Sequence, residues 1–164
     1  FETTKQPLDN NRNPKYFVSI WDVNGVDFTN CRFINRVPEE YDVDARGGGL
    51  LSIGGNYTLT KKCPSPPCSL TEFDRNEFES LRFGVQVSGV SSNLNTQIEG
   101  NVFENNHTAI TLNDAHFVNV VYNDIEVGDE SYSSPIFING VATSSVLLLP
   151  TGIRSYGSSF NKIE

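Results

Sequence analysis

The sequence predicts an all-β protein, a right-handed parallel β-helix (β-solenoid) in which short strands stack coil upon coil. A six-residue pattern, apolar-x-x-Asn/Cys-x-Phe/Ile, recurs along the chain, and a second pattern of alternating apolar residues follows it at a fixed distance. Alternation over three or four residues is typical of strands, and no helical spacing of apolar residues extends over several turns. Repeats of about 20–30 residues without helices indicate a solenoid.

The six-residue pattern occurs four times, with its second copy starting at Phe73. The second and third copies begin 25 residues apart and the third and fourth 22, which predicts coils of about 22–25 residues. Equivalent residues of stacked coils lie about 4.8 Å apart, so we expect one ladder at a turn and one in the core. The turn ladder would comprise Cys31, Asn76, Asn101 and Asn123, and the core ladder Phe33, Phe78, Phe103 and Ile125.

The second pattern, a small residue followed by alternating apolar residues, indicates another strand in each coil. Polar turns rich in Asn, Gly and Ser separate the two patterns, so each coil needs at least two strands. The pattern is found at Gly84–Val87, Ala109–Leu112, Pro135–Ile138, Gly49–Leu51 and Gly152–Ile153.

The chain divides into two parts. Residues 1–15, rich in Asn, Pro and charge, are predicted to be an N-terminal linker or loop, and residues 16–164 the β-helix. A further copy of the pattern opens at Phe160 and stops at Glu164 without a polar cap, so we expect a fragment of a larger protein. Insertions between the first two copies and at Gly128–Ser134 are expected to leave the coils laterally, where solenoids often bind partners.

The charge and hydropathy of the chain argue against two classes of protein. The net charge of −8 comes without a basic stripe, so we expect no nucleic-acid binding. The longest apolar run, Val146–Leu149, is too short to span a bilayer, so we expect no membrane insertion. Trp21 follows the expected strand Tyr16–Ile20, and a packed aromatic is favoured over a sugar-stacking platform.

The cysteines and one acidic segment are candidate sites. Cys63 and Cys68 bracket a proline-rich loop and predict a local disulfide, hence an oxidising compartment. Half a zinc site is the alternative, with further ligands drawn from Cys31, His107 and His116. An acidic loop is predicted to be solvated, with a Ca²⁺ or partner site as the alternative, and no other cofactor is expected. Its residues are Glu39, Glu40, Asp42 and Asp44.

The two patterns together resemble the right-handed parallel β-helix repeats of the pectin-lyase-like superfamily. More narrowly, Cys31-Arg-Phe33, the glycine-rich segment through Ile53, the paired-cysteine loop and Phe83-Gly-Val85 resemble repeat proteins exported by Bacteroidetes. That resemblance implies secretion or cell-surface display, with type IX secretion as the route. It also implies a carbohydrate-active relative as one alternative, since the superfamily includes polysaccharide lyases and hydrolases.

No catalytic constellation is predicted. A hydrolase of this fold needs paired aspartates on neighbouring strands, and the hydrolase and epimerase motifs that the resemblance would imply are absent. A cluster of three acidic side chains and a basic one on a single exposed sheet face would instead favour an enzyme. His107 and His116 are interpreted as surface turn residues without a recognisable Ser or Cys partner. Asp22 and Asp27 flank the expected first strands, and Asp114 and Asp124, after or within the third and fourth coils, are interpreted as turn residues in water.

We therefore expect a non-catalytic structural or adhesive segment of a secreted or cell-surface protein. Its loops would contact a protein partner or a surface polysaccharide, and the secretion machinery is a further expected partner. The alternative is that the coils belong to a carbohydrate-active enzyme, a lyase or hydrolase.

Overall fold

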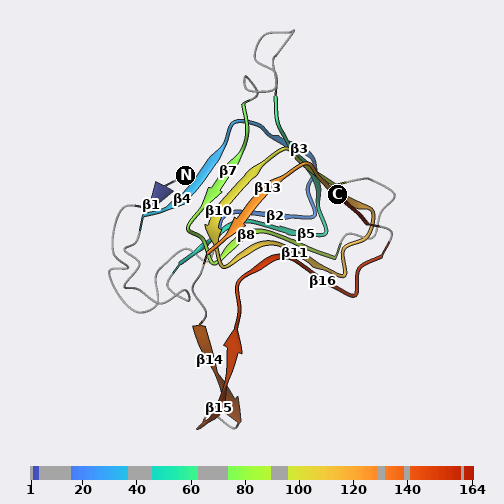
Figure 1. The fold of residues 1–164 in the computed structure, drawn as a ribbon. Coiled ribbons are helices and arrows are strands. Elements are labelled where there is room, and N and C mark those ends of the chain that lie inside the picture. The colour runs from blue at the N-terminus through green and yellow to red at the C-terminus, as the bar shows by residue number, and fades with distance from the viewer. Residues whose placement is uncertain are drawn as a thin grey trace.

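A computed structural model describes residues 2–3, 16–36, 46–62, 74–89, 96–128, 132–138, 141–159 and 161–164. Three parallel sheets form the sides of a triangle in cross-section (Figure 1). From β1 to β10 each strand pairs with the strand three elements further along the chain, so each coil contributes one strand to each sheet. β11 and β12 pair with β16 and β17 in the same way, because β14 and β15 form a separate sheet between them. The parallel β-helix predicted from the repeats is confirmed, with three strands per coil.

Each of the three sheets has five strands. Sheet A comprises β1 (Glu2–Thr3), β4 (Arg32–Asn35), β7 (Glu77–Glu79), β10 (Val102–Asn106) and β13 (Asp124–Val127). Sheet B comprises β2 (Tyr16–Trp21), β5 (Gly48–Ile53), β8 (Phe83–Ser88), β11 (Thr108–Asn113) and β16 (Thr151–Tyr156). Sheet C comprises β3 (Asn24–Phe28), β6 (Asn56–Thr60), β9 (Thr96–Glu99), β12 (Val118–Val121) and β17 (Lys162–Ile163).

The core contains a stack of aromatic rings along the coil axis. Phe33, Phe78 and Phe103 are register partners in sheet A, and Ile125 follows in the next strand. The ring centroids of Phe33 and Phe78 lie 4.7 Å apart, and those of Phe78 and Phe103 lie 4.8 Å apart. These distances equal the spacing of hydrogen-bonded strands, so in-register pairing stacks the rings.

The asparagines stack at the turn between sheets C and A. Asn76 donates its side-chain amide to Oδ1 of Asn101 at 2.8 Å, and Asn101 donates its own to Oδ1 of Asn123 at 2.9 Å. Cys31, in the first coil, donates its backbone N–H to Oδ1 of Asn76 at 3.0 Å. Each asparagine also donates to a carbonyl of the preceding coil: Asn76 to Phe28, Asn101 to Leu59 and Asn123 to Ile98.

The repeat that begins at Phe73 differs from the prediction. Leu59 of β6, and not Phe73, is the register partner of Phe28 and Ile98 in sheet C. Lys62, which follows β6, and Asp74, which precedes β7, pair in an isolated antiparallel bridge. The pattern at Phe73 is therefore a local coincidence, and Phe73 itself lies outside the described residues.

The segment Pro135–Ile138 also differs from the prediction. It belongs to β14 (Tyr132–Ile138), which pairs antiparallel with β15 (Val141–Leu148) in a separate two-stranded sheet. This hairpin extends away from the coils (Figure 1). The insertion in the fourth coil is thus longer than the predicted Gly128–Ser134. The first strand of the next coil is β16, which contains the predicted Gly152–Ile153.

Other predicted segments fall partly or wholly outside the described residues. Glu2–Thr3, within the predicted linker, form β1 and pair with β4. Cys31 is a free thiol. The predicted disulfide cysteines and the acidic loop lie outside the described residues, so both stay predictions: Cys63, Cys68, Glu39, Glu40, Asp42 and Asp44.

Candidate functional site

The outer face of sheet B carries a row of side chains with an exposed aromatic residue at each end. Trp21, Ile53, Ser88, Asn113 and Tyr156 are register partners on successive strands. Because side chains alternate along a strand and the preceding residues Ile20, Val87 and Leu112 point into the core, this row points outward. Trp21 is 65% exposed and Tyr156 56%.

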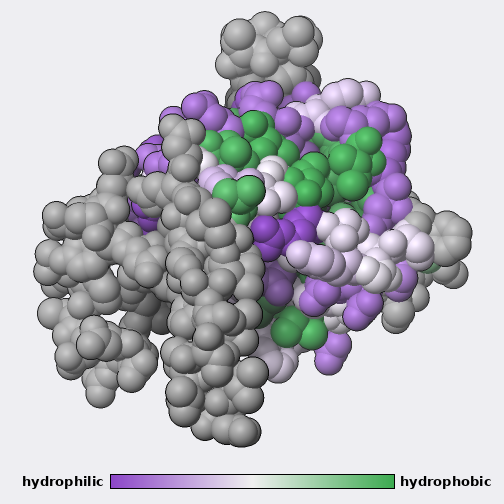
Figure 2. Space-filling model, turned by 60° about the horizontal axis from the view of Figure 1, so that its bottom comes forward, coloured by the Kyte–Doolittle hydropathy of each residue, from purple (hydrophilic) through white to green (hydrophobic). Residues whose placement is uncertain are grey.

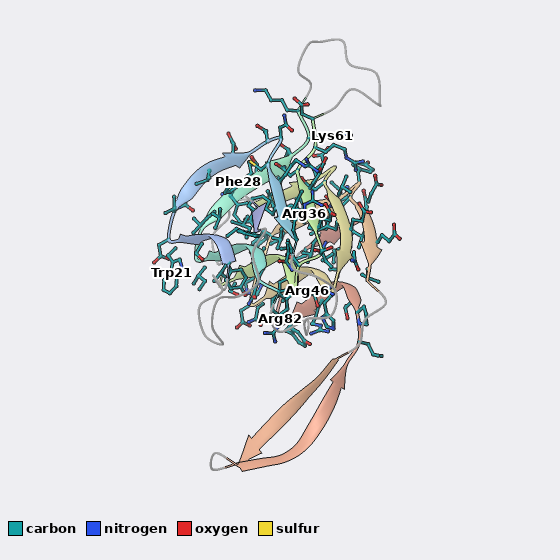
Figure 3. All side chains as sticks on the ribbon, turned by 90° about the vertical axis from the view of Figure 1, so that its left-hand side faces the viewer. Trp21, Phe28, Arg36, Arg46, Lys61 and Arg82 are labelled. Atoms are coloured by element: carbon teal, nitrogen blue, oxygen red, sulfur yellow. The ribbon has the colours of Figure 1, made fainter. Side chains whose placement is uncertain are left out.

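Trp21 does not pack into the core, which corrects the favoured sequence interpretation of this residue. It lies at the edge of the body with its side chain directed away from the coils (Figure 3). Four strand spacings of about 4.8 Å separate it from Tyr156, or about 19 Å along the coil axis. Two exposed aromatic rings so spaced on a rigid sheet are suited to an extended ligand.

The residues beside this row are mainly polar and are held in place by hydrogen bonds. Tyr16 donates its hydroxyl to Oε1 of Gln86 at 2.6 Å, which fixes the orientation of the Gln86 amide. Burial raises the pKa of Tyr16, while the nearby charge of Arg82 opposes the shift. Arg154, in the last coil, donates to Oγ1 of Thr151 at 3.1 Å. Figure 2, turned so that this side comes forward, shows apolar areas bordered by hydrophilic residues.

The face of sheet B lacks the groups that glycoside hydrolysis requires. None of its five strands contains an acidic residue or a histidine, and Arg154 is their one charged residue. Asp22 and Asp114 lie in the equivalent turns of the first and fourth coils, where their backbone N–H groups bond the carbonyls of Ile53 and Tyr156. Those turns are about 14 Å apart, whereas paired catalytic carboxylates lie roughly 5–9.5 Å apart.

The two histidines differ in environment. His107, predicted to be a surface residue, is only 3% exposed, and its backbone N–H bonds the carbonyl of Leu81 at 2.9 Å. It is buried because its turn between sheets A and B stacks on the preceding coil.

His116 is half-buried and has a serine partner that sequence reasoning missed. Its Nδ1 lies 2.7 Å from Oγ of Ser159 and also accepts the Ser159 backbone N–H at 3.1 Å. A general base must have this nitrogen available for the serine proton, and here the backbone N–H competes for it. The neighbouring bond from Ala115 N–H to Ser158 Oγ joins the same two turns, so the contact acts as a link between coils.

The outer face of sheet A is acidic. Glu79, Glu104 and Glu126 are register partners on β7, β10 and β13. An open hollow of about 410 Å³ is lined by residues of β10 and β13, including Glu104, Asp124 and Glu126. Arginines on this face pair with three carboxylates: Arg32 with Glu77, Arg36 with Glu79 and Arg75 with Asp124. In the part of the chain that the structure describes, no group of acidic, Cys or His side chains is arranged to hold a metal.

No family model, curated protein or solved structure matches the chain. Among the described residues, no helix has the length and hydropathy needed to cross a membrane. The fold and the geometry of its faces therefore carry the functional argument.

Proposed function

We propose that the chain is a non-catalytic β-helix platform of a secreted or cell-surface protein that binds an extended glycan along the outer face of sheet B. The observation that carries the proposal is the row from Trp21 to Tyr156. Exposed aromatic rings present flat apolar surfaces to sugar rings, while Gln86, Ser88 and Asn113 between them offer hydrogen bonds to hydroxyl groups.

The rigidity of the platform supports the same proposal. Parallel in-register pairing holds the strands of sheet B, and the Phe stack of sheet A and the asparagine ladder hold together the coils to which those strands belong. A preformed face loses little conformational entropy on binding. Membership of the pectin-lyase-like superfamily, Bacteroidetes origin and type IX export remain part of the proposal, since they rest on resemblance alone. A protein partner or the secretion machinery would use the lateral insertions.

Binding to a panel of extended polysaccharides, measured by calorimetry and affinity electrophoresis, tests the proposal. Trp21→Ala and Tyr156→Ala should each weaken binding about threefold to tenfold, the loss of one stacked aromatic contact. Tyr122→Ala is the matched control, because Tyr122 is also 65% exposed but lies after β12 of sheet C. No binding to any polysaccharide, or equal losses in all three variants, would contradict the proposal.

Carbohydrate cleavage is a second candidate function, supported by the acidic face of sheet A. Glu104 and Glu126 project from neighbouring strands beside the 410 Å³ hollow. A strand spacing of about 4.8 Å is near the roughly 5–5.5 Å carboxyl separation of retaining glycosidases. We favour binding, because both side chains are exposed and a general acid needs apolar surroundings.

Release of reducing ends or unsaturated products from the same polysaccharides distinguishes the two candidates. Activity abolished by Glu104→Gln or Glu126→Gln, but retained in Glu77→Gln, would establish the enzyme. Glu77 is a suitable control because it lies on the same face and is paired with Arg32. Binding without product release would support the platform.

A further inference from the structure

A carboxylate lies beside each of the two exposed rings of the sheet B row. Asp22 directly follows Trp21, and a Cβ on Gly54, in the next coil, would collide with its Oδ1 atom. A Cβ on the glycine that follows Tyr156 would collide with Oδ1 of Asp114 in the same way. Each aspartate therefore lies against the turn glycine of the following coil, at one end of the row. Both aspartates are exposed.

Between the two rings, the outer face of sheet B is uncharged. Six residues of β5, β8 and β11, in register, form this part of the face: Leu51, Ile53, Gln86, Ser88, Thr111 and Asn113. Arg154 donates to Oγ1 of Thr151 at 3.1 Å, so its guanidinium is directed toward the start of β16 and away from Tyr156. Arg82 precedes β8 and lies over the ring of Phe83, at the start of the strand. A polymer with a carboxylate on every sugar would place most of its charges over uncharged side chains.

Building on the glycan binding proposed above, we propose that the ligand of this row is an uncharged polysaccharide. Asp22 and Asp114 accept hydrogen bonds from hydroxyl groups of the sugars that stack on the two terminal rings. A carboxylate accepts hydrogen bonds and donates none, and bonds to a charged acceptor are stronger than bonds to a neutral one. The same two carboxylates, in a chain with a net charge of −8, repel the carboxylates of a polyuronate and so exclude it.

Pairs of polymers that share a backbone and differ mainly in charge test the proposal. Suitable pairs are hydroxyethyl cellulose with carboxymethyl cellulose, and fully methyl-esterified polygalacturonate with its free acid. Calorimetry with the full chain at low ionic strength should show the neutral member of each bound pair binding at least about tenfold more tightly. The preference should shrink at about 1 M salt, because salt screens exposed charges.

Two variants examine the aspartates directly. Asp22→Asn and Asp114→Asn each remove one negative charge and keep the shape of the side chain. Each should reduce the preference for the neutral polymer at least about threefold and weaken binding of that polymer about threefold. The matched control is Asp27→Asn, because Asp27 is exposed, lies in β3 of sheet C and accepts the hydroxyl of Thr58. It should leave both the preference and the affinity unchanged.

The outcomes separate this proposal from the platform on which it depends. Equal binding of both members of a pair, or tighter binding of the charged member, would overturn the proposal and leave glycan binding in place. Binding of a charged polymer that is lost in Arg154→Gln would assign carboxylate recognition to Arg154 and overturn it as well. An equal loss of preference in Asp27→Asn would overturn the role of the two aspartates. No binding to any polymer would contradict the platform itself. The comparison within a pair uses the unmodified chain, so it holds even if a variant fails to fold.

Discussion

Nδ2 of Asn76 donates a hydrogen bond to Oδ1 of Asn101 at 2.8 Å, and both side chains are fully buried. The same Asn101 amide bonds the carbonyl of Leu59 at 3.0 Å and Oδ1 of Asn123 at 2.9 Å. One side chain therefore satisfies polar groups of three successive coils. In a low-dielectric interior such a network is costly to break, because the groups left behind have no water to bond.

Asn101→Ala should lower the free energy of unfolding by roughly 2–4 kcal/mol, since it leaves the Asn76 amide and the Leu59 carbonyl without their partner. Urea unfolding followed by circular dichroism measures the change. Asn113→Ala, an exposed asparagine of sheet B, is the control and should cost about 0.5 kcal/mol or less. Equal losses in the two variants would mean that the ladder adds nothing to stability.

Glycine is required in sheet B where a phenylalanine of the core ladder faces it. A Cβ on Gly84 would lie 2.6 Å from the carbonyl oxygen of Ala109 and 2.8 Å from the Phe103 ring. A Cβ on Gly152 would meet Ile125 at 3.4 Å, an ordinary contact. Gly84→Ala should therefore cost about 1–3 kcal/mol through overpacking.

Gly152→Ala should be neutral, or stabilising by up to about 1 kcal/mol through the lower entropy of the unfolded chain. Gly84 and Gly152 occupy equivalent places on two strands of sheet B. Thermal unfolding of both variants therefore distinguishes steric crowding at Gly84 from a general intolerance of side chains at this place in the coil. The interpretation fails if the alanine at position 152 is as harmful as the one at position 84.

The turn ladder and the core ladder could be predicted from sequence because, in each copy of the pattern, the Phe or Ile follows the Asn or Cys by two residues. The strand that contains Leu59 was missed, since the insertion after β6 separates Leu59 from Asn76 and a similar pattern at Phe73 lies closer. The hairpin was missed although its strands flank Asn139-Gly140, a dipeptide typical of two-residue β-turns. Apolar alternation alone does not distinguish a strand of the coils from a strand of a projecting ribbon.

The candidate site was less predictable than the fold. Whether Trp21 points inward or outward depends on strand register, and a shift of one residue reverses it. The row from Trp21 to Tyr156 joins residues far apart in the sequence, across coils whose lengths differ because of the insertions. A periodic sequence pattern therefore predicts the core and leaves the outer faces undetermined.

Tyr57 is buried with a hydroxyl that has no hydrogen-bond partner among the described residues. Its ring packs edge-on against Phe28, with centroids 6.1 Å apart. Tyr57→Phe keeps that contact and removes the unsatisfied hydroxyl, so the variant should be as stable as the unmodified chain or more stable by about 1–2 kcal/mol.

Burial also makes Tyr57 a cause of alkaline unfolding. Burial raises its pKa above the ordinary value of 10.0, so the folded state holds the proton more tightly than the unfolded state. Stability is therefore fully present below about pH 10 and decreases as the pH rises above it. Unfolding measured against pH should show a smaller alkaline loss in Tyr57→Phe than in the control Tyr122→Phe, whose ring is exposed. Identical alkaline slopes would contradict this assignment.

Arg75 joins three coils through one guanidinium group. Its Nε donates to the carbonyl of Gly100 at 2.7 Å, and its terminal nitrogens donate to the carbonyl of Asn101 at 3.2 Å and to Asp124 at 2.6 Å. Arg75→Ala should cost about 1–2 kcal/mol, whereas the exposed pair of Arg32 with Glu77 should contribute about 0–1 kcal/mol, measured with Arg32→Ala.

Arg75→Lys separates geometry from charge. Lysine keeps the charge but has a single nitrogen, so it cannot donate to two carbonyls and a carboxylate in the planar arrangement of the guanidinium. We expect it to restore less than half of the stability lost in Arg75→Ala. Because two of the three partners are uncharged carbonyls, most of the loss in Arg75→Ala should persist at high salt. Full rescue by lysine, or a loss that disappears in salt, would show that the contribution of Arg75 is its charge and not its fit to the three coils.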